Sequence, residues 1–286
     1  MTAKKEKAEQ TPEEKKKARR KMWIIIISAV LVFLLLEWLF IGYRFNFGPF
    51  KSLGDIRMGK LPGNAENYSV KNLSEIPDSP LSGKDVLFLG SSVSYGSASL
   101  REGIPEYFGV RLGCKVTKEA VSGTTLVDDQ NSSYVSRLLK NVNKNTSYSL
   151  VVVQLSTNDA SKNKPLGEIS KGTSLSDFDT HTVTGAIEYI IAYCRETWDC
   201  PVVFYTGCRY DSDAYAAMVE RLMALQDKWG IGVLDLWHDD TFNAISDEER
   251  ALYMNDSIHP TKAGYRDWWC PEMERQLLSY LNEVSR

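Results

Sequence analysis

Between residue 84 and the C-terminus, short apolar runs alternate strictly with longer amphipathic stretches, and no other feature limits the possible folds so narrowly. Two neighbouring parallel strands need a crossover connection, which is usually a helix. The alternation therefore predicts one α/β domain with a five-stranded parallel sheet and helices on both faces. Strands are expected at residues 86–89, 115–121, 150–155, 202–206 and 233–236, and helices at residues 104–112, 132–142, 182–197, 213–229 and 261–284.

The loops at the carboxyl ends of such strands carry the chemistry. The first expected strand ends at Gly90, which permits a sharp turn, and Ser92 follows where a helix begins. Near the C-terminus, Asp256 precedes His259 by three residues. A carboxylate at this spacing can hold one imidazole nitrogen and leave the other to take a proton from a serine. Ser92, His259 and Asp256 are therefore the predicted catalytic residues.

Two further loops offer hydrogen-bond donors for an oxyanion. The loop Ser122-Gly123-Thr124 follows the second strand and presents the backbone N–H of Gly123. The loop Ser156-Thr157-Asn158-Asp159 follows the third strand and presents the side-chain amide of Asn158. Glycine and asparagine are common in turns, so each loop alone is weak evidence. The two loops together predict an oxyanion hole that includes Gly123 and Asn158.

Taken together, four short blocks resemble the conserved blocks of the SGNH or GDSL-type hydrolase superfamily, over residues 84 to 286. The blocks are Gly90-Ser91-Ser92, Ser122-Gly123, Asn158-Asp159 and Asp256-x-x-His259. The resemblance implies a flavodoxin-like, three-layer α/β/α fold and ester hydrolysis or acyl transfer through a serine nucleophile. By position it implies that Ser92 is the nucleophile and that His259 is the base oriented by Asp256. It also implies that Gly123, Asn158 and, through its backbone N–H, Ser92 form the oxyanion hole.

The chain departs from the family pattern at two positions. Ser91 stands where the family usually has Asp, and Ser156 stands where it usually has Gly. Both positions support the reacting groups, so the departures bear on substrate fit and rate more than on the class of reaction. The G-x-S-x-G and S-x-x-K serine signatures are missing around Ser92, as are a Walker loop and a zinc-binding spacing. No cofactor and no metal are expected.

A continuous apolar run covers residues 23–43. As a helix, its 21 residues would be roughly 31 Å long, close to the thickness of the hydrocarbon core of a bilayer. Nine Lys or Arg precede the run within residues 1–22, which predicts a cytoplasmic N-terminus and an extracytoplasmic domain. A retained anchor is favoured over a cleaved signal peptide, because bulky residues rather than small ones end the run. A buried helix of a soluble protein is the third reading.

These features predict four segments. Residues 1–22 form a basic cytoplasmic tail, residues 23–43 a transmembrane helix, residues 44–83 a tether rich in Gly and Pro, and residues 84–286 the hydrolase domain. Outside the tail, 25 Lys or Arg stand against 33 Asp or Glu, which gives a net charge of −8. A nucleic-acid partner is not expected, because the folded part is acidic.

The expected activity is that of a membrane-anchored serine esterase that removes small O-acyl groups, above all acetyl, from carbohydrate. An O-acyltransferase, a lysophospholipase-type lipid esterase and a non-catalytic carbohydrate-binding scaffold remain as alternatives. Trp237, Trp268 and Trp269 lie near the C-terminal loops and are expected in the core rather than on a sugar. An N-x-S/T sequon at Asn255 adjoins Asp256, which favours a bacterial cell without such glycosylation.

Five cysteines and two further histidines carry weaker signals. Cys194 and Cys200 flank an expected helix-to-strand turn, and a disulfide and two buried thiols are equally compatible with this spacing. His181 and His238 are expected to be structural, because a lone histidine is more often a satisfied structural residue than a catalytic one.

Overall fold

A computed structural model of the chain describes residues 11–45 and 50–284, and the chain divides into two compact units, residues 1–57 and 58–286. Residues 1–10 of the predicted tail and residues 46–49 of the predicted tether lie outside the described residues. The N-terminal helices are α1 (Pro12–Phe45) and α2 (Lys51–Gly59).

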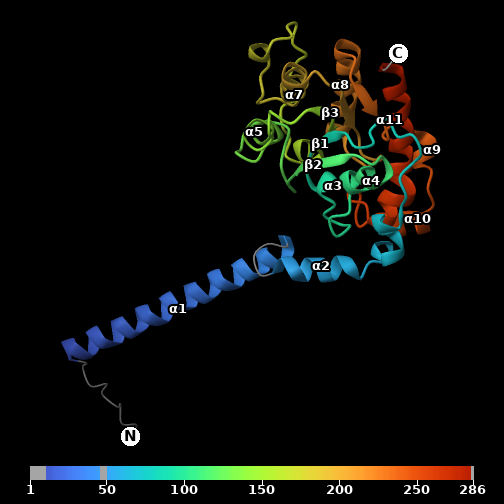
Figure 1. The fold of residues 1–286 in the computed structure, drawn as a ribbon. Coiled ribbons are helices and arrows are strands. Elements are labelled where there is room, and N and C mark those ends of the chain that lie inside the picture. Colours follow the sequence, from blue (N-terminus) through green and yellow to red (C-terminus); the bar gives the residue numbers. More distant parts are fainter. Residues whose placement is uncertain (1–10, 46–49, 285–286) are drawn as a thin grey trace. The chain divides into compact units, whose positions relative to one another are not determined.

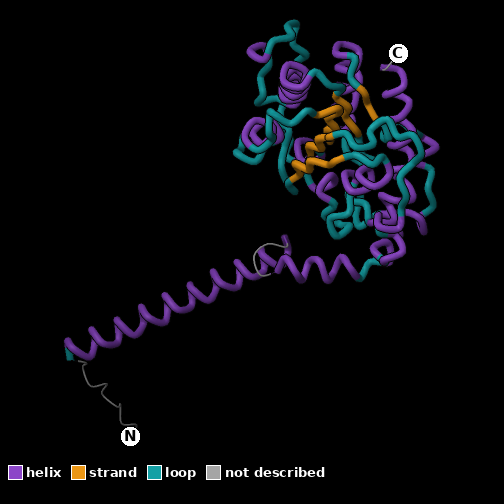
Figure 2. Tube along the Cα trace, in the orientation of Figure 1, coloured by secondary structure: helices purple, strands orange, loops and turns teal. Residues whose placement is uncertain are grey.

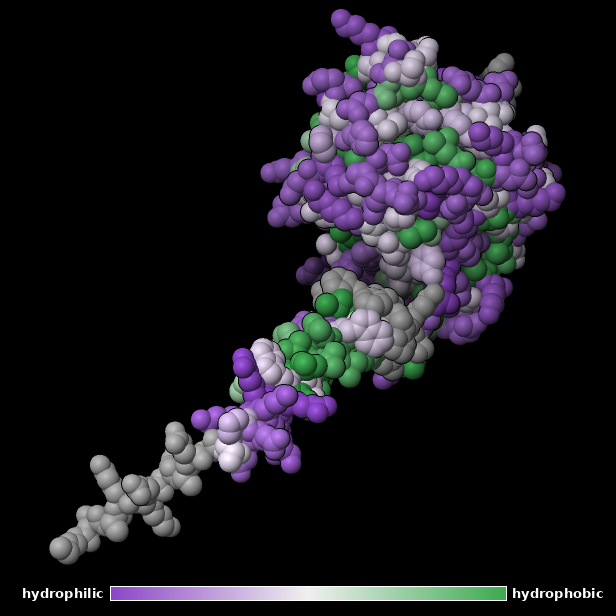
Figure 3. Space-filling view, turned by 90° about the vertical axis from the view of Figure 1, so that its left-hand side faces the viewer, coloured by the Kyte–Doolittle hydropathy of each residue, from purple (hydrophilic) through white to green (hydrophobic). Residues whose placement is uncertain are grey.

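Helix α1 contains the whole apolar run of residues 23–43 and begins eleven residues before it, at Pro12. Thr11 caps this end, because its Oγ1 accepts from the Glu14 N–H and its own N–H donates to Glu14 Oε2. Among the described residues, α1 is the one helix long and apolar enough to cross a membrane, a test that a signal sequence also passes. On the face shown in the space-filling view, its apolar side chains form a green patch next to purple hydrophilic residues (Figure 3).

The second unit is built on one parallel sheet, as predicted (Figure 2). Its strands run in the order β2-β1-β3-β4-β5, and every neighbouring pair is parallel. The strands are β1 (Asp85–Gly90), β2 (Lys115–Ala120), β3 (Tyr148–Gln154), β4 (Val202–Tyr205) and β5 (Gly232–Leu234). Each lies within two residues of its predicted position.

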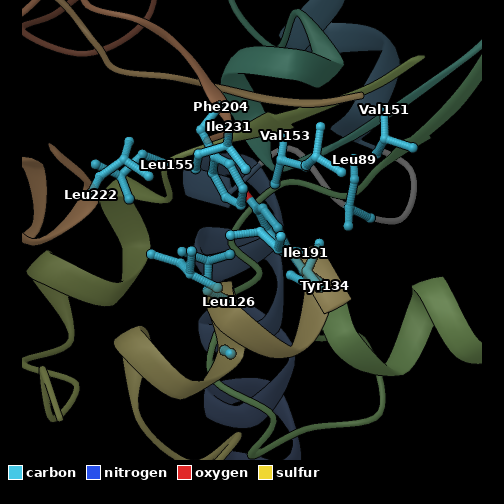
Figure 4. Close-up of a cluster of buried hydrophobic side chains, with 14 of the residues drawn as sticks. Leu89, Leu126, Tyr134, Val151, Val153, Leu155, Ile191, Phe204, Leu222 and Ile231 are labelled. Atoms are coloured by element: carbon cyan, nitrogen blue, oxygen red, sulfur yellow. The ribbon is translucent and has the colours of Figure 1, made fainter. Parts of the chain in front are cut away.

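Helices cover both faces of the sheet (Figure 1). One face packs against α5 (Tyr134–Lys140), α7 (Val183–Trp198) and α8 (Asp213–Trp229). The other packs against α4 (Ile104–Arg111) and α11 (Cys270–Val284). In the first core, Leu89 and Val153 of the sheet lie near Tyr134 of α5 and Ile191 of α7 (Figure 4). The three-layer α/β/α prediction is thereby confirmed.

Several short helices were not predicted, since they are too short to show a helical period. They are α3 (Ser92–Tyr95), α6 (Thr157–Ser161), α9 (Asp240–Asn243), α10 (Asp247–Tyr253) and four 3₁₀ turns at Pro62–Asn64, Glu66–Tyr68, Val70–Asn72 and Leu175–Asp177. The predicted helix over residues 261–284 opens with a π-helical segment, Gly264–Trp269, before α11. Pro271 lacks the N–H that a regular i→i−4 pattern would need there.

Residues 58–83 belong to the same compact unit as the sheet. The buried Asn64 donates from Nδ2 to the carbonyls of Met58 and Ala98, over 2.8 and 2.7 Å, and accepts from the Lys262 N–H over 2.9 Å. Gly63 packs so closely that an added Cβ would overlap the Leu252 carbonyl. This segment is therefore joined both to the chain after Ser92 and to the chain after His259.

The five cysteines are buried and unpaired in the structure. Burial raises the pKa of the Cys114 and Cys200 thiols to about 11 and holds the pKa of Cys194 well above its ordinary value. Thiols with such pKa values are poor nucleophiles at neutral pH.

Candidate active site

The sheet topology brings three loops to one point. Strand β1 lies between β2 and β3, so that the chain leaves β1 toward one neighbour and later returns on the other side. Such a reversal opens a crevice at the carboxyl ends of the strands. Gly90 at the end of β1 is level with Ala120 at the end of β2, and Leu89 is level with Val153 of β3. The loops that carry Ser92, Gly123 and Asn158 therefore start side by side.

Ser92 is the first residue of the short helix α3 and is 7% exposed. The chain turns sharply before it, and an added Cβ at Gly90 would overlap the Ser94 side chain. The helix ends at Gly96, whose φ of 73° lies in the left-handed region and whose N–H closes onto the Ser92 and Val93 carbonyls. Glycine at both ends thus gives the chain the curvature that presents Ser92.

The buried side-chain amide of Gln154, which no sequence pattern indicated, positions this turn. Gln154 Oε1 accepts from the Ser91 N–H over 2.9 Å and from the Ser94 N–H over 3.1 Å. It also lies 3.1 Å from Ser94 Oγ, which in turn is 2.6 Å from the Tyr205 hydroxyl. Gln154 is the last residue of β3 and is 2% exposed, so the sheet itself fixes the position of the Ser92 turn.

We expect Gln154→Met to lower the free energy of unfolding by about 2 to 5 kcal/mol, since it leaves two buried N–H groups without an acceptor. Denaturant titration followed by tryptophan fluorescence measures the loss. The matched control is Gln226→Met, which removes one hydrogen bond, to the Ile231 carbonyl, and is expected to cost about 1 kcal/mol. Equal losses in the two variants would show that the amide of Gln154 does not support the turn.

The structure brings Ser92, His259 and Asp256 into one hydrogen-bonded chain. His259 Nε2 lies 2.8 Å from Ser92 Oγ, although 167 positions separate the two residues in the sequence. His259 Nδ1 lies 2.9 Å from both carboxylate oxygens of Asp256. The imidazole is thus held by the carboxylate on one side and faces the serine hydroxyl on the other, which is the geometry of a nucleophile, its base and an orienting group.

The loop that carries His259 is closed on itself. Met254 and Pro260 form an antiparallel bridge, and the Asn255 N–H donates to the His259 carbonyl over 2.9 Å. Asp256 Oδ1 accepts the N–H groups of Ile258 and His259, each over 2.9 Å. Burial raises the pKa of Asp256, but the hydrogen bonds and charge of His259, with these N–H groups, outweigh burial and hold the pKa well below its ordinary value. The carboxylate is therefore ionised at neutral pH.

The predicted oxyanion residues lie on two loops that are tied together. Asn158 Nδ2 donates to the Thr124 carbonyl over 3.0 Å. The buried Asp159 carboxylate accepts from the N–H groups of Leu126 and Val127 over 2.8 and 3.1 Å. Gly123 is exposed, has a φ of 81°, and its N–H makes no hydrogen bond to any residue that the structure describes. Asp159 is thus a structural member of the block, a role that the sequence analysis left open.

The buried side chain of Arg137, in α5, connects the loops that follow β1 and β2. Its guanidinium is 3% exposed and donates to the carbonyls of Gly90 and Glu119, over 2.8 and 2.6 Å, at the ends of β1 and β2. It also donates to Thr124 Oγ1 over 3.2 Å. One buried cation therefore links the loops that carry Ser92 and Gly123.

His238 does not face Ser92, and three tryptophans are core residues. His238 Nδ1 is 2.7 Å from Asp235 and its Nε2 is 3.0 Å from Glu220, so neither ring nitrogen faces a serine. Trp237, Trp268 and Trp269 are buried. The structure thus places these three rings in the core.

A small pocket adjoins the Ser92 turn. The centre of a water-sized group can occupy a volume of about 10 Å³ in this pocket. The pocket therefore has room for about one such group. Its walls include Val93, Thr157 and Ile258, each of which is adjacent in sequence to a predicted site residue. They also include the fully buried rings of Tyr205, Tyr215 and Trp269. Because these rings are packed on all sides, the back of the pocket is rigid.

Comparisons with known proteins agree with this fold. Among solved structures, a protein from Lactobacillus plantarum has 19% identity and a TM-score of 0.56 over 71% of this chain and 98% of its own. A possible lipase from Chitinophaga pinensis has 14% identity and a TM-score of 0.51 over 71% and 99%. A family two carbohydrate esterase from Clostridium thermocellum in complex with cellohexaose has 14% identity and a TM-score of 0.50 over 71% and 65%.

At these identities the likeness shows the fold alone, and no curated protein matches the chain. The sequence itself gives the stronger result. The family model of the GDSL-like lipase/acylhydrolase family matches residues 88–266, more than half of the chain and the whole stretch from the second half of β1 to beyond His259. The chain therefore belongs to the GDSL-like lipase/acylhydrolase family and is a serine ester hydrolase.

Proposed function

We propose that the protein is a membrane-anchored esterase that removes small acyl groups, above all acetyl, from carbohydrate through an acyl-serine intermediate. The observation that carries the proposed chemistry is the 2.8 Å contact between Ser92 Oγ and His259 Nε2, with Asp256 on the far side of the ring. His259 takes the proton of Ser92 as the oxygen attacks the ester carbonyl. Asp256 holds the imidazole in the required tautomer and stabilises the imidazolium.

The negative charge of the tetrahedral intermediate falls on the carbonyl oxygen. In our proposal the N–H groups of Ser92 and Gly123 and the amide of Asn158 donate to it, and each such donor is worth about 2.7 to 4 kcal/mol of barrier. The imidazolium then gives its proton to the leaving alcohol, and the acyl group stays on Ser92. Water, activated by His259 in turn, releases the acid and restores the serine.

The size of the acyl group follows from the pocket beside Val93. A volume that holds one water-sized group accommodates the methyl group of an acetyl ester and little more. The solved carbohydrate esterase that shares this fold is consistent with a sugar ester as substrate. The size of the pocket favours small acyl groups over the long acyl chains of lipids.

We expect the full-length chain in detergent to hydrolyse p-nitrophenyl acetate with a kcat/KM at least tenfold above that for the butyrate, because each forced methylene costs about 1 kcal/mol or more in a packed site. Ile258→Ala widens the pocket, and it is expected to raise the butyrate-to-acetate ratio. Equal rates for acetate and octanoate would refute the preference for acetyl but not the esterase function. Failure to hydrolyse any of the esters would refute the proposed function.

The N-terminal part of the proposal concerns location. Residues 23–43 of α1 span the cell membrane, residues 1–22 stay in the cytoplasm, and the hydrolase domain, residues 84–286, lies outside. The nine basic residues before the apolar run support this orientation, because positive charge is retained on the cytoplasmic side. The proposed tether, residues 44–83, includes the segment 58–83 that packs with the sheet.

A further inference from the structure

An open groove of about 500 Å³ lies beside the proposed catalytic loop, and its volume falls in the range of ligand-binding sites. Its walls come from the loop after β4, from α10 and from the loop that carries His259. They include Arg209, Tyr210, Asp211, Asp247, Arg250, Asp256 and Ser257. Two of these residues, Tyr210 and Ser257, also line the small acyl pocket, so the groove and the pocket share walls.

The shared walls suggest how an ester lies across the site. When the acyl group occupies the small pocket, the alcohol part must extend on the other side of the carbonyl. The groove includes Asp256 and Ser257, so it borders the loop whose histidine protonates the leaving alcohol in the proposed reaction. The groove is therefore the natural place for the alcohol part.

The chemistry of the walls limits what the alcohol can be. The guanidinium groups of Arg209 and Arg250 can donate hydrogen bonds to a ligand, and the carboxylates of Asp211 and Asp247 can accept them. Two cations stand against three carboxylates, because Asp256 also lines the groove, and this excess of negative charge disfavours a phosphate. The charged groups also make the groove costly for an acyl chain. Hydroxyl groups both donate and accept, so a polyhydroxylated ring satisfies such walls.

Some of these walls are held in place, and others are free to bind. The Tyr210 ring packs against Trp237 and Tyr215, with centroids 5.6 and 5.2 Å apart. Arg209 is fixed by the Trp237 carbonyl and by Asp240. In the part of the chain that the structure describes, the side chains of Arg250 and Asp247 make no hydrogen bond or ion pair.

We propose that this groove binds the sugar ring that bears the ester, with Arg250 and Asp247 hydrogen-bonded to its hydroxyl groups and the Tyr210 ring against one of its faces. The proposal rests on the proposed esterase function and extends it from the acyl group to the alcohol. It makes Arg250 a specificity-determining residue that does not touch the reacting atoms.

The test compares two acetyl esters on the full-length chain in detergent: p-nitrophenyl acetate, whose alcohol is not a sugar, and an acetylated xylo-oligosaccharide. Arg250→Met keeps the stem of the side chain and removes the charged donor. We expect it to lower the ratio of kcat/KM for the oligosaccharide to kcat/KM for p-nitrophenyl acetate about tenfold, chiefly through KM, because a hydrogen bond from a charged group is lost. Arg275→Met is the matched control, since Arg275 is exposed on α11, pairs with Glu272 and does not line the groove.

Each outcome bears on a different statement. An unchanged ratio in Arg250→Met, or an equal drop in Arg275→Met, would overturn the assignment of the groove. Hydrolysis of p-nitrophenyl acetate without any hydrolysis of the oligosaccharide would contradict the assignment of a sugar ring to the groove. It would not contradict the esterase function. Hydrolysis of neither ester would overturn the esterase function itself.

Discussion

Ser92→Ala is expected to lower kcat for p-nitrophenyl acetate by about 10⁶-fold, because the loss of a serine nucleophile removes nearly all catalysis beyond binding and oxyanion stabilisation. The same change should abolish labelling of the chain by a serine-directed fluorophosphonate. Among the described residues, Ser92 Oγ has one hydrogen bond, to His259, so the free energy of unfolding should fall by only about 1 kcal/mol. Steady-state kinetics, probe labelling and denaturant titration measure the three effects separately.

The matched control is Ser97→Ala, two residues beyond the end of α3. Its hydroxyl makes no hydrogen bond within the described ranges, and the side chain is exposed. This variant should keep full labelling and activity. Undiminished labelling of Ser92→Ala would show that another serine reacts, and the proposed mechanism would then lose its nucleophile.

The second large effect is expected for Asp256→Asn, which should lower kcat by about 10⁴-fold. An amide in this position favours the tautomer of His259 that has no lone pair to accept the serine proton, and it carries no charge to stabilise the imidazolium. The pKa of Asp256 lies well below its ordinary value, so the carboxylate is ionised throughout the usual assay range. Steady-state kinetics with p-nitrophenyl acetate at pH 8, where the carboxylate of the unmodified chain is ionised, measures this loss.

The chain provides its own control for this experiment. Asp235 precedes His238 by the same three residues, and its carboxylate lies 2.7 Å from His238 Nδ1. Asp235→Asn removes the same charge next to a histidine that does not face a serine, so the kinetics should change less than twofold. A comparable loss of kcat in both variants would indicate a general effect on folding or charge rather than a specific role of Asp256.

Much of the fold follows from the sequence because its strands are buried on both sides. Such strands are short runs of Val, Leu, Ile and Phe, and the helices between them are long enough to show a period. The shorter helices are too brief for that. Helix α10, for example, has seven residues, none of them buried, so no apolar stripe marks it. The π-helical segment that begins at Gly264 also has no signature in the sequence, because the same pattern fits an ordinary α-helix equally well.

The candidate site is less visible in the sequence than the fold. The Asp-x-x-His spacing occurs twice, at Asp235 and at Asp256, and only the three-dimensional arrangement brings one of the two histidines to Ser92. Gln154 carried no signal, because an amide at the end of a buried strand has no motif of its own. Arg137 was equally hidden, since a basic residue in an amphipathic helix is usually a solvated one, whereas here it is buried beneath the sheet edge.

The contacts of Asn64 limit where the chain can be cleaved to release the enzyme from its N-terminal helix. A fragment that starts at residue 84 would lose Asn64, and the Ala98 carbonyl and the Lys262 N–H would lose the partner they now share. Proteolytic release that keeps these two hydrogen bonds must therefore cut ahead of Asn64. A cut within residues 65–83, although far from Ser92 in sequence, would separate Asn64 from the chain that carries Ser92 and His259.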